Sequence, residues 1–147
     1  MDIFPFAQTD WQRVKAAARA VTNATLADDA VLYASKYSEL EVVLENLRER
    51  YGDHPILLET QADFHDEPSL QLDLYRSAIR LAEKNALPTL TIRLSLASLL
   101  LEEFADPKQA KKELAACHSE LSRYADESEK NEWRELMSKC REEKSPG

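Results

Sequence analysis

The chain has 147 residues and a formal net charge of −8, with 44% hydrophobic and 31% charged residues. This balance excludes a disordered chain and suits one domain built from helices that each keep a polar face. Gly52 and Gly147 are the only glycines, which excludes glycine-rich phosphate loops and argues against an all-β fold with tight hairpins.

The N-terminal third of the chain predicts three helices. Apolar residues recur at helical spacing from residue 11 to about 23, and Thr9 or Asp10 precedes them as a candidate N-cap. A short helix should cover residues 28–34. A third helix is expected over residues 38–51, where leucines and valines again follow one face.

Turn and cap residues mark the next boundaries. Ser38 and Glu41 have the spacing of a capping box at the start of the third helix, and Gly52 is suited to end it. Prolines then open two helices, which we expect over residues 55–65 and 68–85, because a proline in the first turn loses no helical hydrogen bond.

The C-terminal half predicts three more helices. The segment 88–104 is apolar on almost every side, so it should be the central and most buried helix. A helix over 107–124 should follow. Asp126 and Glu129 form a capping box for a last helix over 127–143. The sequence therefore predicts an all-α protein of about seven helices, with the short segment 28–34 not counted among them.

Two of the helical hairpins align as an internal repeat when Pro68 is set on Pro107, 39 residues further along. Small and large residues then recur at corresponding positions: Ala62, Tyr75 and Ala78 in the first hairpin, and Ala97, Leu100, Ala110, Leu114 and Cys117 in the second. Gln71 departs from this pattern, because it stands where a small residue is expected. A two-helix unit of this length is typical of solenoid proteins.

In this pattern the chain resembles the tetratricopeptide repeat over about residues 55–124, although the usual tryptophan and glycine of that family are missing. The resemblance implies antiparallel hairpins, 55–85 and 88–124, stacked as a short right-handed superhelix. The helix 127–143 would cap it, within a single domain of residues 1–143 followed by a disordered tail at 144–147. A non-repeating helical bundle is the alternative, because all helical hairpins share this patterning.

The resemblance also implies which residues meet a partner. In the tetratricopeptide family the first helix of each pair lines the concave face. Carried over by register, this places five polar residues of otherwise apolar helices on that face: Glu59 and Asp63 in one pair, and Thr91, Ser98 and Glu102 in the next. We expect these five side chains to contact a partner protein.

The acidic charge is concentrated in the middle of the chain. Residues 38–83 hold eleven acidic and four basic residues, so nearly all of the excess lies there. Such a stripe repels phosphate, which argues against nucleic acid and anionic membranes as partners, and it attracts a protein with a basic surface. The alternative is that the acidic residues have no binding role and only keep the protein soluble.

The residue types that carry catalysis or bind metals do not form a site in the sequence. His65 lies between Asp63 and Asp66, but near neighbours on a helix point apart and cannot share a metal ion. Cys117 and His118 diverge for the same reason, and Cys117 and Cys140 should be reduced core residues. We therefore expect no catalytic, metal-binding or cofactor-binding residue. An enzyme with an unrecognised site is the least favoured alternative.

The leading hypothesis for function is a non-catalytic protein-binding module. The start of the chain is unlike a signal peptide and the most apolar segment, 94–101, is too short to span a bilayer, so we expect a cytoplasmic protein. In style the chain is similar to the small acidic helical immunity proteins that neutralise a bacterial toxin. An adaptor or chaperone that binds an extended client segment is the alternative. The sequence leaves open the oligomeric state and whether Phe4-Pro5-Phe6 packs on its own chain or on another.

Overall fold

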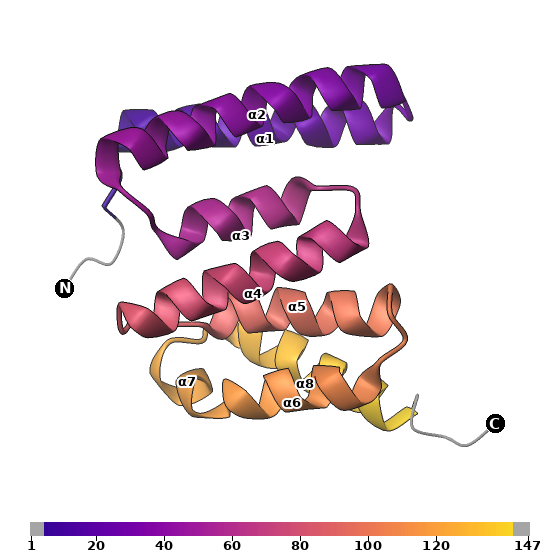
Figure 1. Ribbon diagram of the computed structural model, residues 1–147. Helices are drawn as coiled ribbons and strands as arrows, with labels where there is room; N and C mark the ends of the chain where they lie inside the picture. Colours follow the sequence, from indigo (N-terminus) through magenta and orange to yellow (C-terminus); the bar gives the residue numbers. More distant parts are fainter. Residues whose placement is uncertain (1–4, 143–147) are drawn as a thin grey trace.

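The computed structural model describes residues 5–142, which form eight α-helices and, within that range, no β-strand. The predicted all-α fold is confirmed, with eight helices in place of about seven (Figure 1). In chain order the helices are α1 (Gln8–Leu26), α2 (Ala30–Tyr51), α3 (Pro55–Phe64), α4 (Pro68–Lys84), α5 (Leu90–Glu102), α6 (Pro107–Ala116), α7 (His118–Arg123) and α8 (Glu127–Glu142).

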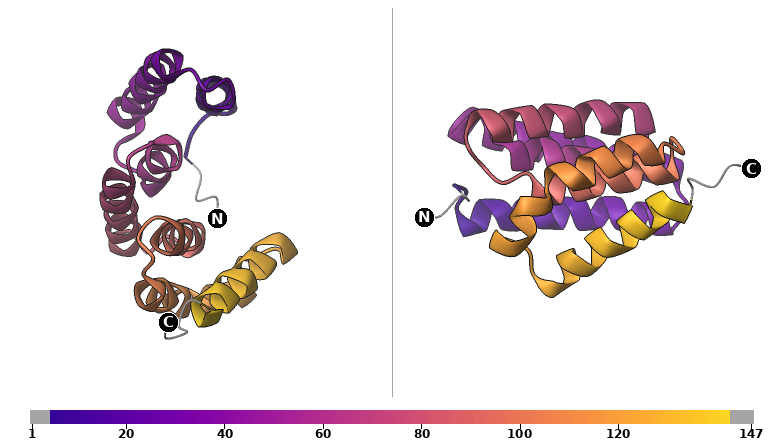
Figure 2. Two further views of the ribbon diagram at one scale, coloured as in Figure 1. Left: turned by 90° about the vertical axis from the view of Figure 1, so that its right-hand side faces the viewer. Right: turned by 90° about the horizontal axis from the view of Figure 1, so that it is seen from below.

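The helices form three antiparallel hairpins, α1–α2, α3–α4 and α5–α6, that follow one another through space. Seen along the helices, α1, α3 and α5 make an inner row and α2, α4 and α6 an outer row, so the molecule curves like a letter C (Figure 2). Helix α8 packs against α5 and α6 and extends one end of the C. The two hairpins expected from the repeat are therefore present, while the handedness of the superhelix stays a prediction.

Three helices begin as the sequence predicts, because Pro55, Pro68 and Pro107 each occupy the first turn, where their missing N–H does no harm. Gly52 ends α2 with φ of +85°, a backbone angle that residues with a Cβ rarely adopt, and its N–H donates to the Arg48 carbonyl over 2.8 Å.

The predicted starts of the first helices are wrong. Helix α1 begins earlier, after Ala7, so neither Thr9 nor Asp10 is its cap. The buried Asp10 carboxylate instead pairs with Arg50 at 2.7 Å and accepts a hydrogen bond from Tyr51 at 2.6 Å. Helix α2 is continuous, so Ser38 does not start a helix. Asp29 is the true cap, accepting from the Leu32 N–H over 3.0 Å. Tyr37 and Leu40, on either side of residue 38, both belong to the buried stripe of α2, and this packing overrides the local capping signal.

The single helix predicted over 107–124 is also wrong, because the chain breaks at Cys117 and turns into α7. The break brings the Glu120 carboxylate onto the start of α5. There it accepts from the backbone N–H of Thr89 at 3.0 Å and of Leu90 at 2.8 Å, and from the Thr89 hydroxyl at 2.8 Å. The first N–H groups of a helix have no partner within it, so a carboxylate from another segment stabilises α5.

Two hydrophobic clusters form the core, one under α1, α2 and the start of α3, the other from the end of α3 to α8. Helix α5 is the most buried helix, as predicted. The small repeat positions Ala62, Ala78, Ala97, Ala110 and Cys117 are all fully buried. Where a small residue is missing, the Gln71 side chain donates to the Ala62 carbonyl over 2.9 Å, so its amide is not left without a partner.

The two ends of the described chain are fixed by local contacts. Asp126 and Glu129 exchange the two hydrogen bonds of a capping box, as predicted for the last helix, and its residues Leu136 and Cys140 are buried. At the other end, Phe6 is buried on its own chain, stacked on Trp11 with 5.6 Å between ring centroids. Phe4 and the expected tail at 144–147 lie outside the described residues. Of residues 5–142, no helix has the length and hydropathy needed to cross a bilayer.

Candidate functional site

The five predicted contact residues all lie on α3 and α5, two neighbouring helices of the inner row. Because Glu59 and Asp63 are one turn apart, their side chains share one face of α3. Thr91, Ser98 and Glu102 are spread along α5. Thr91 lines one cavity, and Ser98 and Glu102 line a second cavity. We call the surface formed by these five residues and the linings of the two cavities the concave face.

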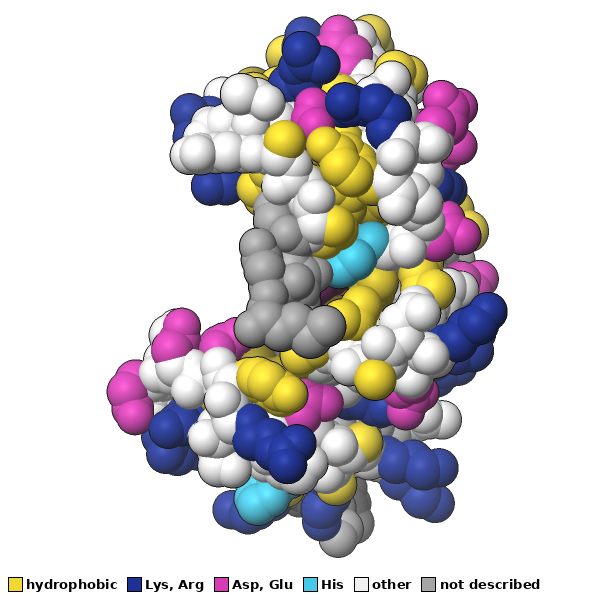
Figure 3. Space-filling view, turned by 90° about the vertical axis from the view of Figure 1, so that its left-hand side faces the viewer, with side chains coloured by type: hydrophobic (Ala, Val, Ile, Leu, Met, Phe, Trp, Pro, Cys, Tyr) yellow, Lys and Arg dark blue, Asp and Glu magenta, His cyan; other side chains and the backbone are white. Residues whose placement is uncertain are grey.

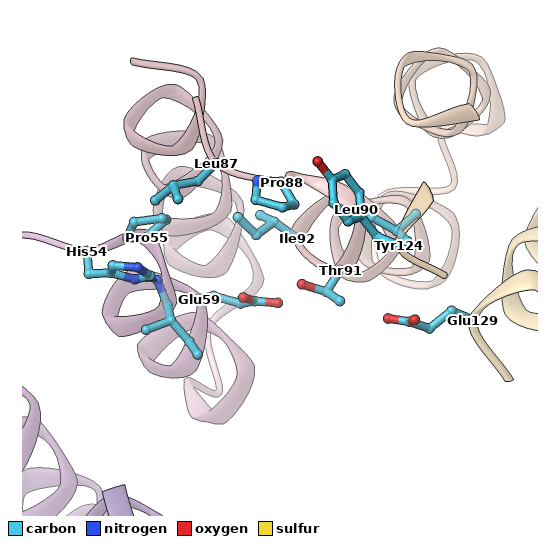
Figure 4. Close-up of a pocket in the computed structure, with 11 residues that line it drawn as sticks. His54, Pro55, Glu59, Leu87, Pro88, Leu90, Thr91, Ile92, Tyr124 and Glu129 are labelled. Atoms are coloured by element: carbon cyan, nitrogen blue, oxygen red, sulfur yellow. Dashed lines mark hydrogen bonds between the residues drawn. The ribbon is translucent and has the colours of Figure 1, made fainter. Parts of the chain in front are cut away.

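The first cavity, of about 340 Å³, lies between the starts of α3 and α5 and the turn before α8 (Figure 4). Its wall is mainly apolar, and we call it the apolar cavity. Its lining is His54, Pro55, Ile56, Glu59, Leu87, Pro88, Leu90, Thr91, Ile92, Tyr124 and Glu129. In the close-up the Glu59 carboxylate and the Thr91 hydroxyl point toward one another across the gap between α3 and α5, and Glu129 approaches from the far side (Figure 4).

The second cavity, of about 280 Å³, lies further along α5, toward the C-terminal end of that helix. Its wall is mainly polar, and we call it the acidic cavity because three carboxylates line it. Its lining is Gln71, Tyr75, Ser95, Ser98, Leu99, Glu102, Glu103 and Glu132. Within it the Ser98 hydroxyl donates to Glu102 over 3.4 Å. The two cavities thus lie one after the other along the length of α5.

Asp63 lines neither cavity, but it is hydrogen-bonded to Tyr75 of the acidic cavity. The Tyr75 hydroxyl, which lines the acidic cavity, donates to Asp63 Oδ1 over 2.5 Å. Burial and the neighbouring Asp63 carboxylate raise the pKa of Tyr75, so this hydroxyl keeps its proton and stays a donor. Burial also raises the pKa of Asp63, and the hydrogen bond from Tyr75 opposes that rise. The Asp63 side chain still reaches solvent in the groove.

Glu59 has the most perturbed carboxylate of the concave face. Burial raises the pKa of Glu59 to about 7, the negative charge of Asp63 adds to the rise, and hydrogen bonding to Thr91 opposes it. The carboxylate therefore changes its charge near neutral pH. A cation placed beside Glu59 and Asp63 would favour the charged forms of both.

The carboxylates of the concave face lack cationic partners in the described part of the chain. None of the ion pairs within residues 5–142 involves Glu59, Asp63, Glu102 or Glu132. Burial and the nearby Glu129 and Glu135 carboxylates raise the pKa of Glu132. When ionised, these groups therefore carry negative charge that no cation within residues 5–142 pairs with.

The acidic stretch seen in the sequence is not the source of most of this charge. Glu39, Glu45 and Glu49 are exposed on α2, in the outer row, and only Glu59 and Asp63 of that stretch reach the concave face. Sequence reasoning missed Glu129 and Glu132, because α8 was expected only to cap the array. Their position on the polar face of an amphipathic helix was the available signal, but it does not say that α8 turns toward the groove.

The two ends of the C differ in charge. In the space-filling view a hollow lies between two projecting ends. The end formed by α8 carries acidic and basic side chains, with acidic ones on the side toward the hollow (Figure 3). At the other end α1 exposes Arg13, Lys15 and Arg19. The acidic half of the groove therefore lies over α3, α5 and α8.

His54 lines the apolar cavity, whereas the other two histidines and both cysteines line neither cavity. The thiol of Cys117 is fully buried, and burial raises the pKa of Cys117 to about 11, whereas His118 is exposed and its ring lies 5.3 Å from that of Trp133. The ring of His65 lies edge-on to Tyr37 at 5.1 Å. Within residues 5–142, no three His, Cys, Asp or Glu side chains are grouped so that they could hold a metal ion.

Comparison with known proteins gives no relative: no protein-family model, no curated protein and no solved structure matches this chain. The resemblance to the tetratricopeptide repeat therefore stays a prediction, with which the hairpin packing is consistent. Function has to be inferred from the concave face itself.

Proposed function

We propose that the protein is a non-catalytic binding module whose concave face holds a basic surface of another protein. The observation that carries this proposal is the set of carboxylates on α3, α5 and α8 that surround two open cavities and have no cationic partner within the described residues. Opposite charge across an interface speeds association and fixes its register, and the same charge repels nucleic acid and anionic membranes.

Within this class, an immunity protein that neutralises a toxin domain with a basic surface is the role we favour. The small size, the acidity and the curved helical scaffold support it, because blocking a toxin needs only a tight and complementary surface. We place this activity in the cytoplasm, as expected from the sequence. An adaptor or chaperone is the second candidate. The two cavities lie one after the other along α5, and such an arrangement could hold an extended segment of a client protein.

Reversing charge in the groove tests the binding module. Glu59→Lys with Asp63→Lys should weaken binding to the partner that co-purifies with the protein by at least tenfold, and added salt should slow the association of the unmodified pair. The matched control is Glu49→Lys with Asp73→Lys, which makes the same charge change on exposed residues of the outer helices α2 and α4. Circular dichroism should show the same helicity in both variants. Equal affinities for the two variants would remove the groove assignment.

A growth experiment separates the two candidate roles. Cells that lose the gene for an immunity protein should be poisoned by sister cells that produce the toxin, and removing the toxin gene should restore growth. Loss of an adaptor should instead reduce the amount or the activity of its client, with no poisoning between cells.

A further inference from the structure

We infer that the concave face takes an extended segment of its partner in which one bulky apolar side chain and a lysine or arginine lie about three residues apart. This inference rests on the proposed function and specifies the chemistry of the ligand. It follows from the different walls of the two cavities and from the distance between them.

The apolar cavity fits a hydrophobic side chain. Pro55, Ile56, Pro88, Leu90 and Ile92 form its wall, and its volume of about 340 Å³ exceeds the size of one large side chain. Burying a leucine or phenylalanine side chain contributes roughly 1.5–3 kcal/mol, which corresponds to a tenfold or larger effect on affinity. Tyr124, whose side chain is 56% exposed, lies at the edge of the cavity and can close over such a group.

The acidic cavity fits one or two cationic side chains. Glu102, Glu103 and Glu132 line it, and the lining residue Tyr75 is hydrogen-bonded to a fourth carboxylate, that of Asp63. Glu102 and Glu103 stand at the C-terminal end of α5, where the last carbonyl groups also favour a positive charge. Lysine or arginine from a partner would supply the cations that residues 5–142 do not place there.

The spacing between the two cavities sets the spacing in the ligand. Thr91 lines the apolar cavity and Ser98 lines the acidic cavity, seven residues further along α5. Seven residues of helix rise by roughly 10 Å. An extended chain covers the same distance in about three residues, so an apolar side chain at one position and basic side chains about three positions away reach both cavities together.

Synthetic peptides test this inference directly. The probe is the fluorescein-labelled peptide Gly-Ser-Phe-Gly-Ser-Arg-Arg-Gly-Ser-Gly, titrated by fluorescence anisotropy into the full chain at low and at physiological salt. Replacing its phenylalanine by serine, or both arginines by glutamate, should each weaken binding at least fivefold. Placing the arginines directly beside the phenylalanine should weaken binding by a similar factor, because one cavity then stays empty.

Variants of the protein assign each peptide contact to its cavity. Tyr124→Ala should remove most of the preference for phenylalanine over serine, and Glu102→Gln with Glu132→Gln should remove most of the preference for arginine over glutamate. Glu49→Gln with Asp73→Gln, on the outer helices, is the matched control and should change neither preference. All of these side chains are exposed, so the variants should fold.

Two results would overturn the inference. Equal binding of all the peptides would show that the groove does not select this pattern. Peptide binding that appears only after deletion of residues 1–4 would show that the chain's own N-terminal segment is the occupant, because Phe6 already packs against His54 at the edge of the apolar cavity. In both cases the proposed function is tested by a separate measurement, the affinity of the Glu59→Lys, Asp63→Lys variant for the natural partner.

Discussion

Replacing Glu59 by glutamine should stabilise the free protein at high pH and much less at low pH. The pKa of Glu59 is raised from 4.5 to about 7 in the folded protein, so folding favours the protonated form. Below pH 4.5 the carboxyl is protonated in both the folded and the unfolded chain, and it contributes no pH-dependent cost. As the pH rises from 4.5 through 7 the unfolded chain ionises first, and the stability of the folded protein falls.

The size of this effect follows from the pKa values. A rise from 4.5 to about 7 corresponds to an upper limit of roughly 3 kcal/mol of lost stability above pH 7. Water in the open groove screens the Glu59 charge and so reduces this loss of stability. We expect the stabilisation by Glu59→Gln to be roughly 1–2.5 kcal/mol larger at pH 8 than at pH 5.

Urea denaturation followed by circular dichroism at the two pH values measures this difference. Glutamine keeps the shape of the side chain and can still bond to Thr91, so packing should not change. Glu49→Gln, on the exposed surface of α2, is the control and should give the same small effect at both pH values. If Glu59→Gln changes stability equally at pH 5 and pH 8, then Glu59 is not desolvated by the groove and the account of its carboxylate is wrong.

Three further substitutions test how the scaffold is built, each by chemical denaturation. Ala97→Phe should destabilise the protein by about 1–3 kcal/mol, because Ala97 is fully buried between packed helices; a neutral result would mean that this contact is loose. Glu120→Ala should cost about 1–3 kcal/mol, because three donors at the start of α5 lose their acceptor, and an unchanged stability would refute that cap. Asp126→Ala should cost about 1 kcal/mol through loss of the capping box of α8, whereas the exposed neighbour Glu127→Ala should cost less.

Patterns that act locally were predictable from the sequence. Pro68 and Pro107 fix helix starts through their own ring geometry, and the apolar run of α5 predicts a central helix because no side of it prefers water. The small residues Ala97 and Ala110 mark close helix contacts for a similar reason, since a larger side chain would not fit.

Features that depend on distant contacts were not predictable in this way. Asp10 has the residue type of a cap, but the ion pair with Arg50, forty residues away, uses its carboxylate instead. The break at Cys117 depends on Glu120 reaching the start of α5, which no local pattern shows. The five candidate contacts were found through the repeat register, whereas Glu132 joins them only because α8 packs against α5.

Photo-crosslinking in the native cell tests the central claim most directly. A benzophenone amino acid placed at Thr91, on the concave face, should form a covalent adduct of one defined mass with a partner protein. The same group placed at Asp73, exposed on the outer helix α4, should form none. Adducts that form at position 73 and not at position 91 would mean that the protein binds its partner through the opposite face.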